Sequence, residues 1–279
     1  MEKYQTNLVT YDNKINQISF KGLKPLELNI LNVMMATARN FNGEPVSMSF
    51  NELKELSQWK NTSGSSRLVD SIRKFNQKLI GLSLPFYNIE TGDEGHIAMF
   101  QKIWLNERTQ GVVFELNRQF VQYYNDLTSS FTSYQLEDMT GLKGFYPKEI
   151  YRMMNSQKGT YRYQQNDGWN VWREPIESFR GFLGIPKSYQ MANIDQRVLQ
   201  PALEQIMQNN LFADMKIEKE KNGVGNKITD IAIYFKTHDQ AEKEKNRKEE
   251  IKNQKEQAEK ERQEKEWKEN MMKHLRVAK

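Results

Sequence analysis

Few side chains in this sequence could carry out catalysis or bind a metal. It has no cysteine, and its three histidines, His96, His238 and His274, form neither a His-x-His nor a His-Glu-x-x-His pattern. Neither a Gly-x-x-x-x-Gly-Lys-Ser/Thr loop nor a Gly-x-Gly-x-x-Gly loop occurs. The acidic residues form no pair that stands apart from helix surface charge. The sequence therefore predicts no catalytic residue, no metal site and no cofactor, and an enzyme is the last class we consider.

A different chemistry, contact with DNA, is better represented. Polar and basic side chains gather before and along a helix predicted at 194–210, on the face opposite its apolar residues. An arginine can hold a guanine through two hydrogen bonds, and a glutamine can hold an adenine in the same way. We expect the residues that contact DNA here to be Lys187, Ser188, Tyr189, Gln190, Gln196, Arg197 and Gln200.

Two of these expectations have an alternative. Tyr189 could contact a phosphate or a thymine methyl group, or it could pack inside the turn as a core tyrosine. Lys219, Lys221 and Lys227 belong to a predicted hairpin and are expected to contact phosphates. The alternative is that the hairpin is merely solvated, since surface lysines are common.

The elements that would position these side chains follow the order of a winged helix. A short amphipathic helix is predicted over 175–183, with Pro175 at its first position, and a turn broken by glycine and proline follows. The longer helix at 194–210 has Asn193 as its expected N-cap, and a hairpin of alternating apolar residues covers 214–236. In a winged helix the second helix can enter the major groove, and the hairpin can reach the adjacent backbone.

Pro201 conflicts locally with the long helix. A proline inside a helix removes one backbone donor and its ring collides with the carbonyl four residues earlier. We therefore expect a kink at Pro201 or a later start of the helix.

The first half of the chain repeats this order. Helices are predicted at 25–40, 51–59 and 67–82, and strands at 46–49, 84–89, 97–105 and 112–116. An offset of 131 residues superposes the apolar patterns of the two halves, which indicates two tandem winged helices. The residues expected to contact DNA in the first half are Ser65, Ser66, Arg67, Arg73, Lys74 and Lys78. Because Asp70 dilutes this basic face, contact with the DNA backbone or dimerisation competes with base reading, and Ser65 or Ser66 can simply cap the helix.

The net charge of +5 is unevenly distributed. Residues 141–237 hold 14 Lys and Arg against 10 Asp and Glu, whereas residues 20–140 hold 12 against 13. The basic excess suggests an anionic partner such as DNA. The sequence has no apolar run near 18 residues, and its first 20 residues lack the apolar core of a signal peptide, so we expect a cytoplasmic protein without a membrane span.

We predict an α+β protein with two tandem winged-helix domains and a charged C-terminal tail. The predicted divisions are an N-terminal arm that is mobile (1–24), a first domain (25–140), a second domain (141–237) and the tail (238–279). Helices are also predicted at 120–125, 131–140 and 147–156, and a short strand near 169–172. The tail is dense in Lys and Glu at four-residue spacing, so it is either a solvated helix or disordered; an interaction arm is the other interpretation.

Two motifs in the second half resemble the iteron-binding plasmid replication initiators. They are Phe182-Leu-Gly-Ile-Pro-Lys-Ser-Tyr189 and Arg197-Val-Leu-Gln-Pro-Ala-Leu-Glu-Gln-Ile206, which is similar to the family's Val-Leu-x-Pro-Ala-x-x-Glu-Ile string except that Gln205 is inserted. Pro201 belongs to that string, and Tyr146-Pro-Lys-Glu-Ile-Tyr-Arg152 is similar to the helix that opens the family's second domain. The resemblance covers about residues 25–236 and is specific in the second half.

The resemblance implies a double-stranded DNA partner in the form of direct repeats at a plasmid origin. It also implies opening of the origin without cutting, recruitment of host helicase or initiator proteins, and a homodimer that represses its own gene while the monomer binds the repeats. A transcriptional regulator without origin function would share every motif. A scaffold whose winged helices bind protein is a third class, and DNA binding that is absent or insensitive to salt would favour it.

Overall fold

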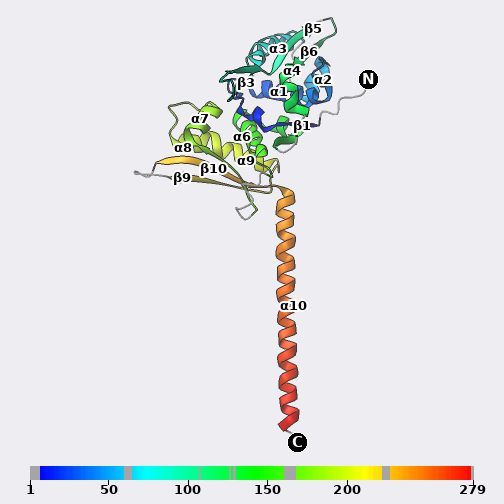
Figure 1. Cartoon of the computed structure of the whole chain (residues 1–279), viewed down its shortest axis with the longest axis vertical. Helices are drawn as coiled ribbons and strands as arrows, with labels where there is room; N and C mark the ends of the chain where they lie inside the picture. Colours follow the sequence, from blue (N-terminus) through cyan, green and yellow to red (C-terminus); the bar gives the residue numbers. More distant parts are fainter. Residues whose placement is uncertain are drawn as a thin grey trace.

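The computed structural model describes residues 7–59, 65–106, 108–125, 127, 130–159, 168–221 and 227–277. Of residues 40, 65–68 and 269–277 only the backbone is described. Helices and short antiparallel sheets form a body from which one long helix projects (Figure 1). The α+β class predicted from the sequence is confirmed.

The first winged helix is built from three helices and a three-stranded sheet. Its sheet has the order β2-β6-β5, so the strand that comes first in the chain pairs with the last one. We use the name "first winged helix" for α1 (Pro25–Ala38), β2 (Val46–Ser49), α2 (Phe50–Leu56), α3 (Ser65–Ile80), β5 (Phe100–Asn106) and β6 (Gly111–Leu116).

The second winged helix repeats this topology. Its sheet has the order β8-β10-β9, in which the first strand again pairs with the last and the last with the middle one. It consists of β8 (Asn170–Pro175), α7 (Ile176–Leu183), α8 (Met191–Ile194), η4 (Asp195–Leu199), α9 (Gln200–Gln208), β9 (Asp214–Lys221) and β10 (Ile228–Lys236). The identical strand order confirms the predicted tandem pair of winged helices.

The N-terminal segment, residues 8–23, is not a mobile arm, so that prediction was wrong. Its strand β1 (Leu8–Asp12) pairs antiparallel with β7 (Phe131–Gln135), and the 3-10 helix η1 (Asn13–Gln17) follows. Most apolar residues of the segment are buried, among them Val9, Tyr11, Ile15, Ile18 and Phe20, whereas Leu8 at its start is exposed. They are spread among polar residues, so the sequence alone did not reveal a strand whose paired residues lie 119 to 127 positions further along the chain, from Asp12 with Phe131 to Leu8 with Gln135.

A helix predicted over 131–140 also proved wrong in its first half. Residues 131–135 form β7, and only α5 (Leu136–Gly141) is helical. Aromatic and hydroxyl side chains in Phe-Thr-Ser-Tyr-Gln favour a strand, and pairing with β1 decides the matter. The remaining predictions between the winged helices agree with α4 (Arg118–Asn125) and α6 (Phe145–Ser156).

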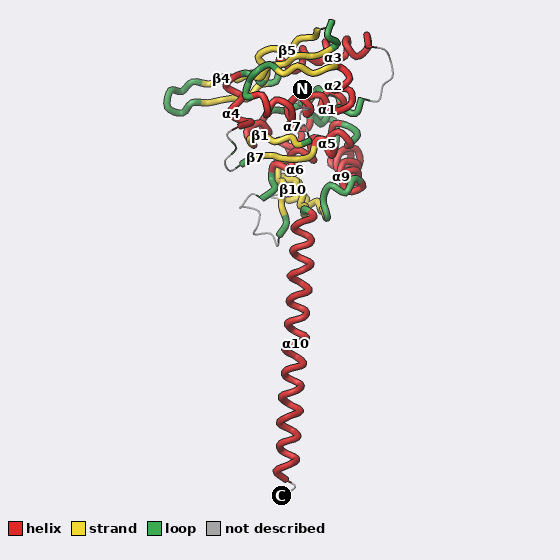
Figure 2. Tube along the Cα trace, turned by 90° about the vertical axis from the view of Figure 1, so that its right-hand side faces the viewer, coloured by secondary structure: helices red, strands yellow, loops and turns green. Residues whose placement is uncertain are grey.

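An additional hairpin separates α3 from β5. It consists of β3 (Ser83–Tyr87) and β4 (Glu94–Ala98), which form a two-stranded sheet that projects from the body (Figure 2). The single strand predicted over 97–105 is thus divided at Met99 between β4 and β5.

One hydrophobic core extends through both winged helices. The buried residues of α1, α6, α9 and β10 belong to the same cluster, and α6 packs against both β7 and α9. In Figure 1, β1 and α6 lie between the first winged helix and the second. The predicted boundary near 141–145 is not tested by this arrangement and stays a prediction.

The charged tail is helical. Helix α10 covers His238–Val277, and intrahelical ion pairs at four-residue spacing support it, as with Lys248 and Glu244 at 2.6 Å. Its start is fixed to the second winged helix: the Asn170 amide donates to Gln240 at 2.6 Å, and Lys236 is ion-paired with Glu244. No helix in the described ranges is both long and apolar enough to cross a membrane.

Candidate DNA-binding interface

The long helix of the second winged helix exposes the side chains that we predicted to read bases. Segments α8, η4 and α9 follow one another without a break from Met191 to Gln208. Gln196, Arg197 and Gln200 are exposed. The opposite face is buried in the core and consists of Ile194, Val198, Leu199, Ala202, Leu203 and Ile206. The amphipathic division predicted from the sequence is confirmed.

The helix begins earlier than expected. Its N-cap is Gln190, whose backbone carbonyl accepts a hydrogen bond from the Asn193 N–H at 2.9 Å. The Gln190 N–H donates to the Asn193 side chain at 3.0 Å, so the predicted N-cap Asn193 instead stands at the third helical position. Lys187, Ser188 and Gln190 are exposed in the turn that precedes this start. These three side chains therefore flank the helix N-terminus, which favours anions.

Pro201 is accommodated by a wider helical turn. Residues 195–199 are a π-helix, in which the Gln200 N–H donates to the carbonyl of Asp195, five residues earlier. The wider turn suits a proline that would otherwise collide with the carbonyl of Arg197. Because the helix continues through the proline, the later helix start that we gave as one alternative was wrong, and the kink that we gave as the other stays a prediction. The π turn carries Gln196 and Arg197, so it also sets how these two side chains leave the helix.

Tyr189 supports Arg197. The guanidinium carbon of Arg197 lies 5.3 Å from the centre of the Tyr189 ring, and its Nη1 donates to the tyrosine hydroxyl at 3.4 Å. Tyr189 is half-buried and packs against the core. The Tyr189 carbonyl accepts a hydrogen bond from Arg180 at 2.8 Å. The Tyr189 ring thus packs against the core, as the alternative prediction stated, and it also orients the Arg197 side chain.

Sequence reasoning missed Arg180 as a residue of this site. It lies in α7 and holds the turn through a backbone carbonyl. A lone basic residue on a short helix gives no sequence signal for such a contact, because its acceptor is a main-chain atom.

The three lysines of the hairpin β9–β10 that were predicted to contact phosphates have two kinds of surroundings. Lys219 is ion-paired with Asp195 of η4 at 2.5 Å, so it ties the hairpin to the long helix. Lys221 and Lys227 are exposed at the two ends of the loop that joins the strands. Residues 222–226 of that loop lie outside the described residues. Lys221 and Lys227 are thus the lysines of this hairpin that face solvent at its tip.

In the first winged helix two of the predicted cations, Arg73 and Lys78, are engaged within the protein. Arg73 is ion-paired with Asp70 at 3.1 Å on the exposed face of α3. Lys78 is ion-paired with Glu27 at 2.6 Å and also donates to the Gly22 carbonyl. Lys74 is exposed. Among the described side chains of this face, two of the three predicted cations are therefore held by carboxylates.

Three further predicted residues lie in the first turn of α3. Ser65, Ser66 and Arg67 open the helix, which thus starts before the predicted position 67 and includes the two serines that were expected as possible caps; their side chains lie outside the described part of the chain. Among the described residues, no group of His, Cys, Asp and Glu side chains could hold a metal ion.

Comparison with known proteins agrees with this geometry. A family model described as "Initiator Replication protein, WH1" matches residues 8–155, and one described as "Initiator Rep protein, WH2" matches residues 175–235. A curated relative, "Probable replication protein rep" of Bifidobacterium longum (strain NCC 2705), is 27% identical over 215 residues, which cover 76% of this chain and 68% of the relative. The solved structure of the Pi initiator protein in complex with iteron DNA has the same fold, with a TM-score of 0.63, 12% identity, and coverage of 83% of this chain and 97% of that one.

Proposed function

The chain belongs to the family of initiator replication proteins with two winged-helix domains, and we propose that it starts plasmid replication by binding direct repeats, iterons, at the origin. A non-enzymatic, DNA-binding role follows from the family, and the bound iteron DNA of the structural neighbour supports the choice of ligand. The observation that carries the proposal is the topology. Two winged helices with the same strand order share one core, so each can place a helix in a major groove of the same duplex.

In this proposal the second winged helix reads bases. Arg197 donates to guanine from its platform on Tyr189, and Gln196 and Gln200 pair with adenine. Lys187, Ser188 and Gln190 contact the DNA next to the helix N-terminus. Lys221 and Lys227 contact phosphates from the hairpin, whereas Lys219 holds the hairpin in place through Asp195.

The first winged helix contacts mainly the DNA backbone. Ser65, Ser66, Arg67 and Lys74 are the groups that we assign to phosphates, and Arg73 and Lys78 contribute less because Asp70 and Glu27 hold them. This division gives the second winged helix most of the sequence selectivity. Dimerisation through the first winged helix is compatible with its weaker base reading.

The partners of the protein complete the proposal. The monomer binds the repeats, and a homodimer represses the protein's own gene. Host helicase or initiator proteins are recruited to the opened origin, in the cytoplasm where plasmid DNA resides. A domain boundary near residue 141 belongs to this proposal, with α6 as the first helix of the second domain, although the match to the WH1 family model starts at residue 8 and extends to residue 155.

A footprint of the protein on the DNA flanking its own gene tests the proposal. If both helices occupy successive major grooves, each protected repeat should span about two helical turns, ~20 bp. Protection of several direct repeats supports the initiator. One protected inverted site at a promoter would instead indicate a transcriptional regulator, and no protection at low salt would contradict DNA binding altogether, since phosphate contacts are strongest there.

A further inference from the structure

A buried ion pair lies in α6, between the two winged helices. Arg152 Nη2 is 2.7 Å from Glu149 Oε2, its Nε is 3.2 Å from Oε1, and both side chains are only 1% exposed. Burial is the largest influence and by itself would lower the pKa of Arg152, but Glu149, Tyr11 and Tyr134 together raise it above its ordinary value, so the guanidinium remains charged. A charge in this position must keep its partners, because an unpaired buried charge is costly.

The partners of Arg152 come from other elements. Its Nη1 donates to Asn16 Oδ1 at 2.8 Å, and Nη2 to the Ile18 carbonyl at 3.4 Å. The guanidinium also lies over the Phe20 ring at 4.3 Å and 5.2 Å from the centre of the Phe182 ring of α7. Arg152 thus contacts the N-terminal segment on one side and the second winged helix on the other.

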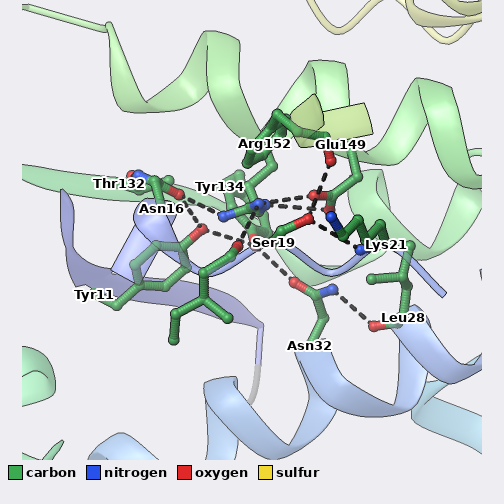
Figure 3. A network of polar contacts seen from close by, with 12 residues as sticks. Tyr11, Asn16, Ser19, Lys21, Leu28, Asn32, Thr132, Tyr134, Glu149 and Arg152 are labelled. Carbon is green, nitrogen blue, oxygen red and sulfur yellow. Dashed lines mark hydrogen bonds and ion pairs between the residues drawn. The ribbon is translucent and has the colours of Figure 1, made fainter. Parts of the chain in front are cut away.

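Hydrogen bonds continue from Asn16 to the first winged helix (Figure 3). The Asn16 amide donates to Thr132 at 2.7 Å, and the Tyr11 hydroxyl donates to Asn16 at 3.1 Å. Tyr134, next to Tyr11, donates to Asn32 of α1 at 2.6 Å. A chain of directional contacts therefore runs from α6 through β1 and β7 to α1.

The same segment is attached to the second winged helix. The Ser19 hydroxyl donates to the Phe182 carbonyl of α7 at 3.1 Å. The N-terminal segment is therefore in contact with both winged helices, as α6 is. Its hydrogen bonds and the charge of Arg152 constrain orientation, whereas apolar packing alone is non-directional.

We propose that Arg152 is a positioning residue that holds the two winged helices in one relative orientation and so makes the protein selective for the spacing between the two halves of its DNA repeat. The inference rests on the proposed function. One inserted base pair moves the second half-site by about 3.4 Å and rotates it by about 34°. To follow that movement the winged helices would have to reorient, which would separate the guanidinium from Asn16 and the Ile18 carbonyl or from the Phe182 ring.

The test compares binding to a footprinted repeat and to versions with one or two base pairs inserted at its centre. The wild type should lose about tenfold or more in affinity for each insertion, since half of the contacts are misplaced. The variant Glu149→Leu/Arg152→Met replaces the pair by apolar side chains, a type of exchange that folded proteins tolerate. The affinity of this double variant should fall by less than about threefold when the same base pairs are inserted. Its order of preference among single half-sites should remain that of the wild type.

A matched control is available in α10. Glu259 and Arg262 have the same residue types and the same spacing, but their side chains are 62% and 70% exposed. The variant Glu259→Leu/Arg262→Met should discriminate against insertions as the wild type does. Arg152→Lys keeps the charge but loses the two-armed hydrogen bonding, so it should show intermediate tolerance and serves if the double variant does not fold.

The outcomes separate the two proposals. A wild type that binds no repeat contradicts the proposed function itself. A wild type that binds but accepts insertions without loss overturns the positioning role, and so do folded Arg152 variants that discriminate as strongly as the wild type. Relaxed spacing in these variants with unchanged half-site preference supports the role, because a merely weakened fold would lower affinity for all sites alike.

Discussion

The two winged helices have one topology but treat their cations differently. In the second, Arg197 is exposed and rests on an aromatic ring, and the glutamines beside it face solvent. In the first, Arg73 and Lys78 are held by carboxylates of the same unit. A cation bound by its own protein reaches DNA only after that pair is broken. The comparison teaches that a shared fold does not imply that basic side chains at similar places are equally available to a ligand.

The difference is one of degree, since Lys219 of the second winged helix is also held, by Asp195. That pair joins the hairpin to the long helix, so it stabilises the surface that we expect to contact DNA. In the first winged helix, Glu27 and Lys78 join α1 to α3 and stabilise the helical scaffold. Each ion pair thus has a local structural role. The side chains expected to contact DNA are the exposed ones of the long helix, which these pairs do not include.

The largest expected effect concerns the buried ion pair of Glu149 and Arg152, which lies between the two winged helices. Arg152→Ala leaves Glu149 buried without its partner, which should cost about 3–5 kcal/mol of unfolding free energy. Arg262→Ala, in an exposed pair of the same type, should change stability by less than about 0.5 kcal/mol. Urea unfolding of both variants measures the difference. Equal losses would mean that the burial of Arg152 has no energetic consequence.

The next effect separates the two units in DNA binding. Arg197→Ala should weaken binding by about 1–3 kcal/mol and relax selectivity at one base pair, because it removes a bidentate contact. Arg73→Ala should cost less than about 0.5 kcal/mol, since Asp70 already holds that guanidinium. Competition binding with single-base variants of the repeat measures both. A uniform loss over all sequences for Arg197→Ala would contradict base reading.

A third effect concerns Lys148, a cation in α6 that is 1% exposed and donates to the Met139 carbonyl. Burial lowers the pKa of Lys148 to about 7 from an ordinary value near 10.5. Between these two values the unfolded chain binds the proton and the folded one does not, so this residue makes stability rise with pH by at most about 1.4 kcal/mol per unit. Below pH 7 Lys148 is protonated in both the folded and the unfolded state, so the stability that its burial costs no longer changes with pH.

Lys148→Met should therefore be most stabilising, relative to the wild type, near pH 6–7, and the advantage should shrink towards pH 10. Thermal unfolding of both proteins across that range measures it. A stability difference that does not change with pH would show that Lys148 keeps an ordinary pKa in the folded protein.

The smallest effect distinguishes lysines that contact phosphate from those held within the protein. Each of Lys221→Ala and Lys227→Ala should reduce the slope of log affinity against log salt concentration by about 1. Each should also weaken binding to all DNA sequences by the same factor. Lys78→Ala should leave that slope nearly unchanged, because Glu27 already neutralises the lysine. Affinities measured over a salt series give the slopes. Identical slopes for all three variants would remove the distinction.

Local patterns predicted much of this architecture. The strand Val46–Ser49 and the start of the helix at Pro25 agree to the residue, because a turn or a proline marks them. The winged-helix order and the exposed side chains of the long helix followed from apolar spacing. The family motif containing Pro201 was recognised, whereas the π turn that accommodates it requires backbone geometry that spacing does not encode.

The parts that escaped prediction depend on distant partners. Strand β1 was taken for an arm because its partner β7 lies at the other end of the first half, and 131–135 was taken for a helix for the same reason. Glu149 and Arg152 have the spacing of an ordinary surface pair, and only tertiary packing distinguishes them from Glu259 and Arg262. Whether Arg73, Lys78 and Lys219 are available to DNA likewise depends on carboxylates that folding brings near them.

The most direct test of unequal base reading is a scan of one repeat in which every base pair is substituted in turn and the affinity of the wild-type protein is measured. Substitutions in the half facing the second winged helix should cost about 1–3 kcal/mol at several positions, and those facing the first should mostly cost less than about 0.5 kcal/mol. Equal costs in the two halves, or larger costs in the half facing the first winged helix, would contradict the account.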